Sequence, residues 1–497
     1  MNFEFVNLQY YIRNVLYLSM KLIAKPFLPF WIFTLALMLV LTLPSLIQDG
    51  MFNDALLYTS VSRNLAHGMG SFWFPYFDPY NIIGLNSFHE QPPLAFGIQS
   101  LFFRLLGDSM YTERIYTLLM LALSAFLIKK IWNEIFCQQT EYQAMGWLSW
   151  LLWISIPVCF WSYTNNMHEN TMGVFILGAC LVMYKALKRE QLMVAYWVLA
   201  GLLLGLAALT KGFPGLFPLS FPFLYWAITH ESTFRKMLLQ TLLLIATLVV
   251  VGVALYLYTP SHDSLSIYLF KRAFARIQGA HSVDSRFFIV FRLFSELLPQ
   301  LCFTIVVYLI ARSQKIKFML SGFNKTTLLF FALGLCGSLP LMLTKVQNGF
   351  YMVGALPYFA IAFALLNVHS LYIFISNIKA SVSKNLLMGT VLLLLAVLFF
   401  SFSKIGGTVR DKSIVHDVHL IGKNIPAFTA MGCKKDIYER WEIACYFVRY
   451  YNISLNKADT NQYFLTMKYD SIGLPNHLLK MEMDLEMFDL YKRNTGL

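Results

Sequence analysis

The chain has 497 residues, of which 58% are hydrophobic and only 13% charged, and its net charge is +13. Soluble domains carry about 25% charged residues, so a chain this poor in charge must bury its apolar surface in lipid. The lysines and arginines are scattered in short segments between apolar runs, which argues against a nucleic-acid groove and indicates a membrane-topology signal. The composition therefore predicts a multi-pass helical membrane protein.

Apolar runs of about 20 residues recur along the chain, and each is long enough to cross a hydrocarbon core of about 30 Å. Residues 1–25 precede the first run and are typical of a basic interfacial helix. The fold class that we expect is mainly α: a transmembrane helical bundle of about 11 spans, although the region around residues 193–228 can be divided differently. The predicted spans are 28–47, 114–132, 144–161, 170–187, 193–210, 213–228, 238–258, 289–311, 326–343, 351–368 and 386–403.

The distribution of basic residues predicts the orientation of this bundle. With the N-terminus inside, the short inner segments hold sixteen of the 39 lysines and arginines, whereas the short outer turns hold little more than Lys211 and Lys345. The loops 48–113 and 259–288 then face outward, and so does the polar tail. Residues 1–403 form the transmembrane domain, and residues 404–497 form a small extracytoplasmic α/β domain with a helix-like "DIYERWEIACYFVRYY" and a strand-like "QYFLTMKY".

The first outer loop contains the segment "QDGMFNDALLY". Leu57, Val61 and Leu65 recur at four-residue spacing, which predicts a helix that lies along the membrane surface. Asp54 lies in its first turn and Tyr58 one turn later on the same face. Asp54 either complements the helix dipole or acts as a general base that accepts a proton from an incoming hydroxyl.

Three further segments carry polar residues that could belong to a site. In "FHEQPPLAF" the double proline ends one element and starts the next helix, so His89 and Glu90 are either ordinary loop residues or part of a site. Glu169 in "NNMHENTMGVF" either begins a polar helix or contributes a second acid. Lys211 lies between two spans, where a lysine is costly unless it meets an anion or water, or unless it snorkels to the surface.

These segments together resemble the GT-C membrane glycosyltransferases, in particular the aminoarabinose-transferase and protein-mannosyltransferase-like group, over about residues 25–370. The chain departs from the group's pattern at Ala55, where a second acid is frequent, and at Gln91, where a lysine is frequent. The matching segments are Asp54 with Tyr58; "EQPPLAFGIQSLFFRLLGDSMYTERIYTLL" with Pro92, Pro93, Leu94, Gly107 and Arg114; "GLAALTKGFPGLFP" with Lys211; and "TKVQNGFYMVGALPYFAIAFALL" with Lys345, Tyr351 and Pro357.

The resemblance implies transfer of a sugar from a polyprenyl-phosphate donor to a lipid, glycan or protein acceptor. It implies a GT-C-like transmembrane domain in a bacterial inner membrane, with the active site facing the periplasm and a role in the cell envelope, such as lipopolysaccharide modification. Asp54 and Glu169 are then the catalytic residues. Arg286 is a further candidate cation. The expected substrate-binding residues are Tyr58, His89, Glu90, Lys211, Arg272, Arg276, Lys345 and Tyr351.

We expect no cofactor to be required, because lysine and arginine can neutralise the donor phosphate. His89, His168 and His281 all map to the outer side and could share a divalent metal, but none is indicated. Cys433 and Cys445 could pair if the tail is extracytoplasmic. The expected partners are the donor, the acceptor and membrane lipid, and no nucleic acid. The alternative functions are a multi-span transporter or lipid flippase, although no clear internal repeat is present, and a non-catalytic scaffold.

Overall fold

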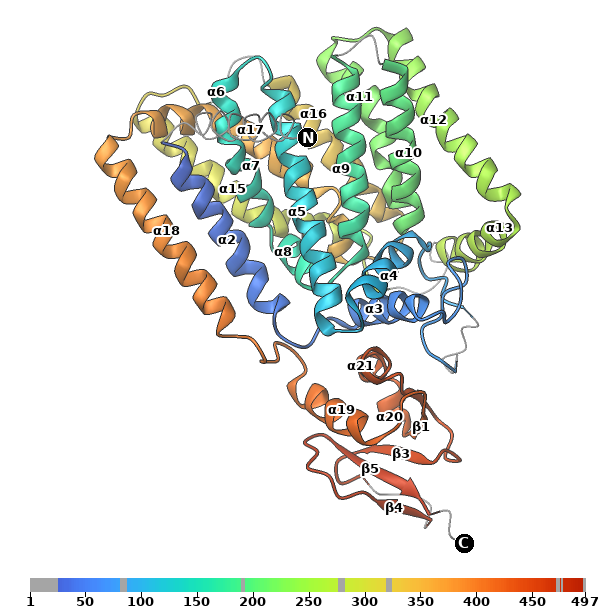
Figure 1. Cartoon of the computed structure of the whole chain (residues 1–497). Helices are drawn as coiled ribbons and strands as arrows, with labels where there is room; N and C mark the ends of the chain where they lie inside the picture. Colours follow the sequence, from blue (N-terminus) through green and yellow to red (C-terminus); the bar gives the residue numbers. More distant parts are fainter. Residues whose placement is uncertain are drawn as a thin grey trace, which may run out of the picture.

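A bundle of long helices carries a small α/β domain at one end (Figure 1). The computed structural model describes residues 26–80, 87–188, 193–275, 282–318, 324–470, 474 and 477–494. In this part of the chain, eight helices are long and apolar enough to cross a membrane, which confirms the predicted class. They are α2 (Leu28–Leu46), α5 (Met110–Ile135), α10 (Met193–Lys211), α12 (Phe234–Leu257), α15 (Phe288–Ser313), α16 (Asn324–Ser338) with η5 (Leu339–Leu343), α17 (Leu356–Ser376) and α18 (Ala380–Phe402).

Prolines explain two of the three places where the structure departs from the predicted spans. Residues 140–164 form α6 (Thr140–Gln143), η1 (Ala144–Gly146), α7 (Trp147–Ile154) and α8 (Pro157–Thr164), and the chain bends by 80° at the break before α8. Ile156 is extended there because Pro157 disfavours helical backbone in the residue before it. Pro214 and Pro218 likewise leave η3 (Phe213–Ser220) as a 3₁₀ helix before α11 (Phe221–Thr229).

The third departure is α9 (His168–Ala186), which is less apolar than the eight candidate spans. It packs extensively against α10, and most of its side chains are buried inside the bundle. Figure 1 shows α9 and α11 alongside α10 and α12. Burial by neighbouring helices therefore allows polar residues in α9 that lipid would not tolerate.

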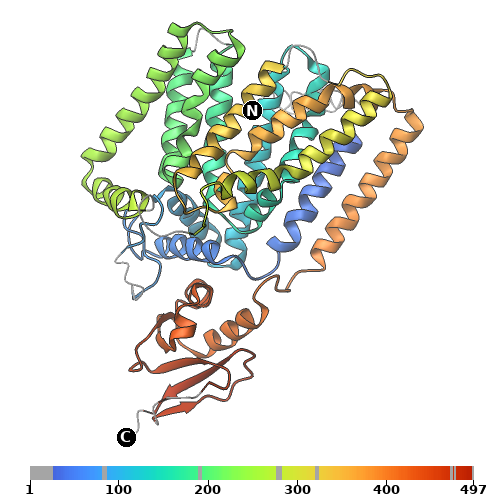
Figure 2. The same cartoon turned by 180° about the vertical axis from the view of Figure 1, so that it is seen from behind.

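Short helices cover the end of the bundle that faces the α/β domain, which we call the domain-side face (Figures 1 and 2). They are α3 (Asn53–Ala66), α4 (Leu94–Leu106), α13 (Thr259–Ser266) and the π-helix η4 (Ile267–Ala273). A further 3₁₀ turn, η6 (Gly349–Met352), precedes α17. The surface helix predicted to begin near Asp54 is therefore confirmed as α3.

The C-terminal domain is a five-stranded mixed sheet with helices packed against it, as predicted. The strand order is β2-β1-β3-β5-β4, in which β1 is parallel to β2 and β3 while β5 is antiparallel to β3 and β4. Cys433 and Cys445 are both buried and unpaired. The elements are α19 (Lys412–Asn424), β1 (Ala430–Cys433), α20 (Lys435–Tyr438), α21 (Trp441–Tyr451), β2 (Ser454–Asn456), β3 (Tyr463–Met467), β4 (Leu478–Lys480) and β5 (Phe488–Arg493).

A cluster of charges joins this domain to the bundle; Arg63, Glu113 and Arg449 are buried in it, and Asp108 is partly exposed. Arg449 of α21 contacts both oxygens of Glu113 in α5, at 3.2 Å and 2.8 Å, and its Nη1 lies 2.8 Å from Asp108. Asp108 also pairs with Arg63 of α3, whose Nη2 donates to the carbonyl of Val448 at 2.7 Å. Burial lowers the pKa of Arg63 to about 10, with a further contribution from nearby Arg449. We call these four charged residues the docking cluster.

The linker to the domain is also fixed directly to the start of the first loop. The backbone N–H of Asp49 donates to Gly407, and the N–H of Val409 donates to Asp49, both at 2.9 Å. The Asp49 carboxylate accepts hydrogen bonds from His419 and Tyr450. Burial alone would raise the pKa of Asp49, but these hydrogen bonds and that of Gly50 hold it below the ordinary value.

Candidate active site

The structure brings Glu169 and Lys211 together as a buried ion pair. Glu169 lies in the first turn of α9, and Lys211 is the last residue of the neighbouring helix α10. Lys211 Nζ is 2.8 Å from Glu169 Oε1, and the two side chains are only 6% and 1% exposed. Among the described residues, neither charged group has a further hydrogen-bond partner. Burying charges with so few hydrogen bonds is costly, which is typical of a site that binds a polar ligand or water.

Two tyrosines flank the Lys211 ammonium group. Nζ lies 5.3 Å from the ring centroid of Tyr58 and 5.8 Å from that of Tyr351, so both rings offer their π-electrons to the cation. Tyr58 is in α3 and Tyr351 in η6, which are far apart in the sequence. Four of the predicted site residues, Tyr58, Glu169, Lys211 and Tyr351, therefore meet at one point.

Asp54 lies one helical turn before Tyr58 on α3, and its charge acts on the Tyr58 hydroxyl. Burial raises the pKa of Tyr58; Lys211 opposes this rise, whereas Asp54 and Glu169 add to it. Asp54 is partly buried. The aspartate and the lysine thus lie on the same side of the bundle and share Tyr58 as a neighbour.

His168 also belongs to this group, although the sequence suggested it only as one of three histidines that could share a metal. Its ring stacks on Tyr58 at a centroid distance of 4.3 Å and meets the edge of Phe96 at 4.6 Å. It is 2% exposed, and neither ring nitrogen has a hydrogen-bond partner in the described part of the chain. The signal available in the sequence was its position next to Glu169 at a helix start.

A cavity of about 550 Å³ opens beside Lys211. Lys211, Gln91 and Tyr351 contribute polar groups to its wall, and most of the remaining lining is apolar. Asp54 and Glu169 do not line this cavity themselves. Gly212 follows Lys211 with a positive φ of 78°, and a Cβ there would lie 1.9 Å from the hydroxyl oxygen of Tyr268. The Lys-Gly turn therefore needs glycine so that η4 can pack closely against it.

His89 and Glu90 hold the first loop against α13 and η4. Glu90 Oε1 lies 2.9 Å from Arg272 Nη1, so this arginine pairs with the protein's own carboxylate. The His89 ring nitrogens contact the hydroxyls of Ser87 at 2.5 Å and Ser264 at 3.3 Å. Burial lowers the pKa of His89 to about 4, and the cations Arg272 and Lys271 contribute. These contacts place the residues beside Gln91 at the cavity wall, and their binding to substrate stays a prediction.

The remaining candidates do not line the cavity or lie outside the described residues. Lys345 does not line the cavity, although its neighbours Thr344 and Val346 do, and Arg286 is exposed. Arg276 and His281 lie outside the described residues. Within the described residues, no group of three or more histidine, cysteine, aspartate or glutamate side chains could hold a metal ion.

Comparisons with known proteins bear on the fold. Residues 90–256 match the family model of dolichyl-phosphate-mannose-protein mannosyltransferases. The fold is similar to that of ArnT from Cupriavidus metallidurans bound to undecaprenyl phosphate, with a TM-score of 0.65 and 12% identity over 93% of this chain and 98% of that one. The apo state of the same protein gives a TM-score of 0.60, with 11% identity over 92% and 95% of the two chains.

A more distant similarity extends to an archaeal enzyme. The oligosaccharyltransferase AglB from Archaeoglobus fulgidus, in complex with an inhibitory peptide and a dolichol-phosphate, gives a TM-score of 0.50 and 11% identity over 88% of this chain and 69% of that one. No curated protein sequence matches the chain. The predicted resemblance to the GT-C membrane glycosyltransferases is confirmed, and the chain has their fold.

Proposed function

We propose that this protein is an integral membrane glycosyltransferase that moves a sugar from a polyprenyl-phosphate donor to a lipid, glycan or protein acceptor. The buried Lys211–Glu169 pair beside a largely apolar cavity carries this proposal. A lipid-linked phosphate needs a fixed cation at its charged end and an apolar wall along its chain, and the cavity offers both. The similar ArnT structure contains undecaprenyl phosphate, which supports the same class of donor.

The chemistry is a displacement at the anomeric carbon of the sugar. The bond between this carbon and the phosphate oxygen breaks while the acceptor oxygen bonds to the carbon. Lys211 stabilises the departing polyprenyl phosphate, and Asp54 orients the acceptor hydroxyl and takes its proton. An acceptor that is itself a phosphate needs no base, and Asp54 then orients it. Holding both substrates in line supplies much of the rate.

The proposed location is the inner membrane of a bacterium, with the domain-side face in the periplasm. Segments rich in lysine and arginine connect the spans at the opposite end, as expected for a cytoplasmic side. Asp54, Lys211 and the C-terminal domain all lie toward the domain-side face. Sugar transfer would then take place on the same side as that domain.

The test is sugar transfer by the purified full chain in liposomes that contain envelope lipids and radiolabelled polyprenyl-phosphate sugars. We expect Asp54→Asn to reduce labelled product by about 10²- to 10⁴-fold, as for loss of a general base. Asp263→Asn removes an exposed carboxylate of α13 and serves as the matched control. Movement of labelled lipid across the bilayer without transfer, unchanged in the Asp54 variant, would instead support a flippase.

A further inference from the structure

An open groove lies between the end of α3, the turn that follows it and α4, and its volume is about 480 Å³. Gly68 and Gly70 line the groove without side chains, whereas Leu101 and Arg104 of α4 contribute side chains to its wall. Within the described part of the chain, the groove shares no lining residue with the cavity beside Lys211. It is therefore a separate place at which a ligand can bind.

Contacts between three segments give the groove its shape. The ring of Phe72 lies against α4 at Gly97, where an added Cβ would lie 2.4 Å from a ring carbon. Glycine at this position therefore lets the turn pack directly on the helix. Arg104 Nη2 lies 3.5 Å from the carbonyl oxygen of Leu65, which ties the arginine to the end of α3. The groove is thus built from α3, the turn and α4 together.

The guanidinium of Arg104 has donors available for a ligand. A guanidinium carries five N–H donors, and the Arg104 side chain is exposed. Among the described residues, no carboxylate pairs with it. Asp108, four residues later, pairs instead with Arg63 and Arg449. The groove therefore presents a positive charge that the protein itself does not neutralise.

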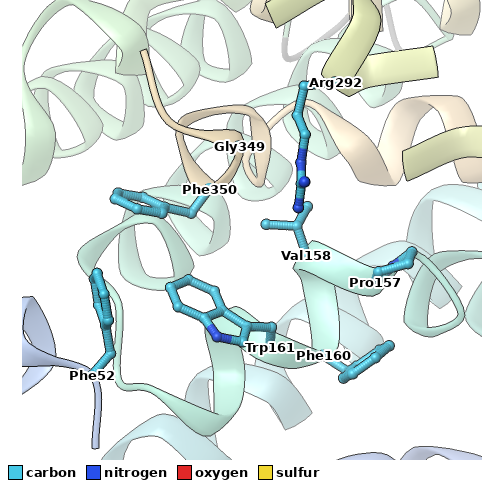
Figure 3. Close-up of a pocket in the computed structure, with 8 residues that line it drawn as sticks. All are labelled: Phe52, Pro157, Val158, Phe160, Trp161, Arg292, Gly349 and Phe350. Carbon is cyan, nitrogen blue, oxygen red and sulfur yellow. The ribbon is translucent and has the colours of Figure 1, made fainter. Parts of the chain in front are cut away.

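Another cavity lined by an arginine differs in this respect. It has a volume of about 430 Å³ and lies between the start of α3, α8, α15 and η6 (Figure 3). Its arginine, Arg292, has Nη2 only 2.6 Å from Glu296 Oε1. The charge of that guanidinium is offset within the protein, so Arg104 is the better ligand for an anion.

Exposed apolar side chains place the groove beside the hydrocarbon layer. Leu101 and Leu105 of α4 are 52% and 82% exposed. The exposed apolar surface continues onto α5, a candidate membrane span, through Ile115 and Leu119. A continuous apolar surface of this kind is typical of contact with a membrane. Acyl chains can therefore reach the groove along α4 and α5.

Aromatic side chains beside the groove indicate the level of the lipid head groups. The ring of Phe72 meets that of Trp73 edge-on at a centroid distance of 4.9 Å. Trp73 lies 6.4 Å from the ring of Tyr258, which directly follows the candidate span α12. Tryptophan and tyrosine collect where the membrane meets water. The groove thus lies where acyl chains join their head groups.

We propose that this groove binds an anionic phospholipid of the surrounding bilayer, such as phosphatidylglycerol. The guanidinium of Arg104 binds the phosphodiester, and the two acyl chains lie along the exposed apolar faces of α4 and α5. The lipid is distinct from both substrates of the proposed reaction, and it joins the end of α3 to α4. Its binding does not depend on the transferase function.

Tryptophan quenching in nanodiscs tests this site. The full chain is placed in phosphatidylcholine nanodiscs that contain a small fraction of brominated phosphatidylglycerol or brominated phosphatidylcholine. Each protein is compared with the same protein carrying Trp73→Phe, and the difference isolates the fluorescence of Trp73 beside the groove. We expect phosphatidylglycerol to quench this signal at an about fivefold lower mole fraction, the factor for one basic residue near an anionic lipid. Arg104→Gln should remove the preference, and Arg104→Lys should keep most of it.

The control is Arg235→Gln, which removes an exposed arginine at the opposite end of α12 and should keep the wild-type preference. Equal quenching by the two lipids in the wild type, or full preference in Arg104→Gln, overturns the site. Loss of the preference in Arg104→Lys as well counts against it, because that variant keeps the charge. Unlabelled undecaprenyl phosphate that displaces the brominated lipid better than unlabelled phosphatidylglycerol does would overturn the assignment to a phospholipid.

Discussion

Two buried groups of opposite charges lie on the domain-side face, and they differ in how completely their hydrogen bonds are made. In the docking cluster, Arg449 contacts both oxygens of Glu113, an oxygen of Asp108 and the carbonyl of Ser109. Glu169 and Lys211 are similarly buried, yet among the described residues the contact between them is the only polar contact of either charged group, and the Lys211 ammonium otherwise faces the rings of Tyr58 and Tyr351.

This difference separates a structural from a functional use of buried charge. Desolvating two ions is offset only when the geometry is good and other hydrogen bonds complete the arrangement. The docking cluster meets that condition and holds two parts of the chain together. The Lys211 pair does not, but it adjoins a cavity, so a bound phosphate could complete it. The comparison predicts that the first group sets stability and the second sets activity.

The largest expected effect comes from a substitution that breaks the docking cluster. Arg449→Ala leaves Glu113 buried without its guanidinium, which should cost about 3–5 kcal/mol of the free energy that holds the C-terminal domain on the bundle. Chemical denaturation of the detergent-solubilised protein, together with proteolysis of the linker, measures this loss. The double variant Arg449→Leu/Glu113→Leu should recover much of the stability, and equal stability of Arg449→Ala and wild type would contradict the structural role.

The second-largest expected effect concerns the Lys211–Glu169 pair, where sugar transfer should change and stability should not. Lys211→Met with Glu169→Gln removes both charges while keeping similar shapes, so stability should change little. Sugar transfer should fall by about 10²- to 10³-fold, the size expected when a group that stabilises developing charge is lost. Initial rates with radiolabelled donor, alongside thermal unfolding, check both statements. A variant that is destabilised but fully active would contradict the functional role of this pair.

The smallest effect concerns His89, a buried titratable residue with neutral partners. Its folded pKa of about 4 lies below the ordinary value of 6.5, so the unfolded chain binds more protons between these values. The stabilising contribution of neutral His89 is complete above about pH 6.5 and is lost as the pH falls toward 4. We expect Tm to drop by about 2 °C more in the wild type than in His89→Gln between pH 7 and pH 5, measured by scanning fluorimetry. An equal drop of Tm in the wild type and in His89→Gln would contradict this contribution of His89 to stability.

The sequence predicted those features that depend on local pattern. The four-residue spacing after Asp54 gave the surface helix α3, and the segments around residues 441–451 and 463–467 are a helix and a strand as expected. The length of the apolar run at 144–161 predicts one continuous span, whereas proline restricts the residue before it and bends the chain before Pro157. Local sequence pattern therefore predicts most of the elements, and the wrong span prediction also has a local cause.

Partner choice over long distances was not accessible from the sequence. Arg272 looked like a phosphate ligand, but the fold places it against Glu90, which is far away in the chain. The resemblance gave Lys211 and Glu169, whereas nothing in the pattern indicated that Arg449 pairs with Glu113, 336 residues earlier. Such pairs are decided by how helices and loops pack, and a single sequence records that packing only indirectly.

The backbone pairing of Asp49 with Gly407 and Val409 ties the C-terminal domain to the chain five residues before Asp54. We therefore expect a displacement of the domain to be transmitted to the first turn of α3. The position of the C-terminal domain and that of the Asp54 carboxylate are thus coupled. A protein truncated after α18 would lose Gly407 and Val409, and with them the backbone hydrogen bonds that fix the chain at Asp49 just before α3 begins.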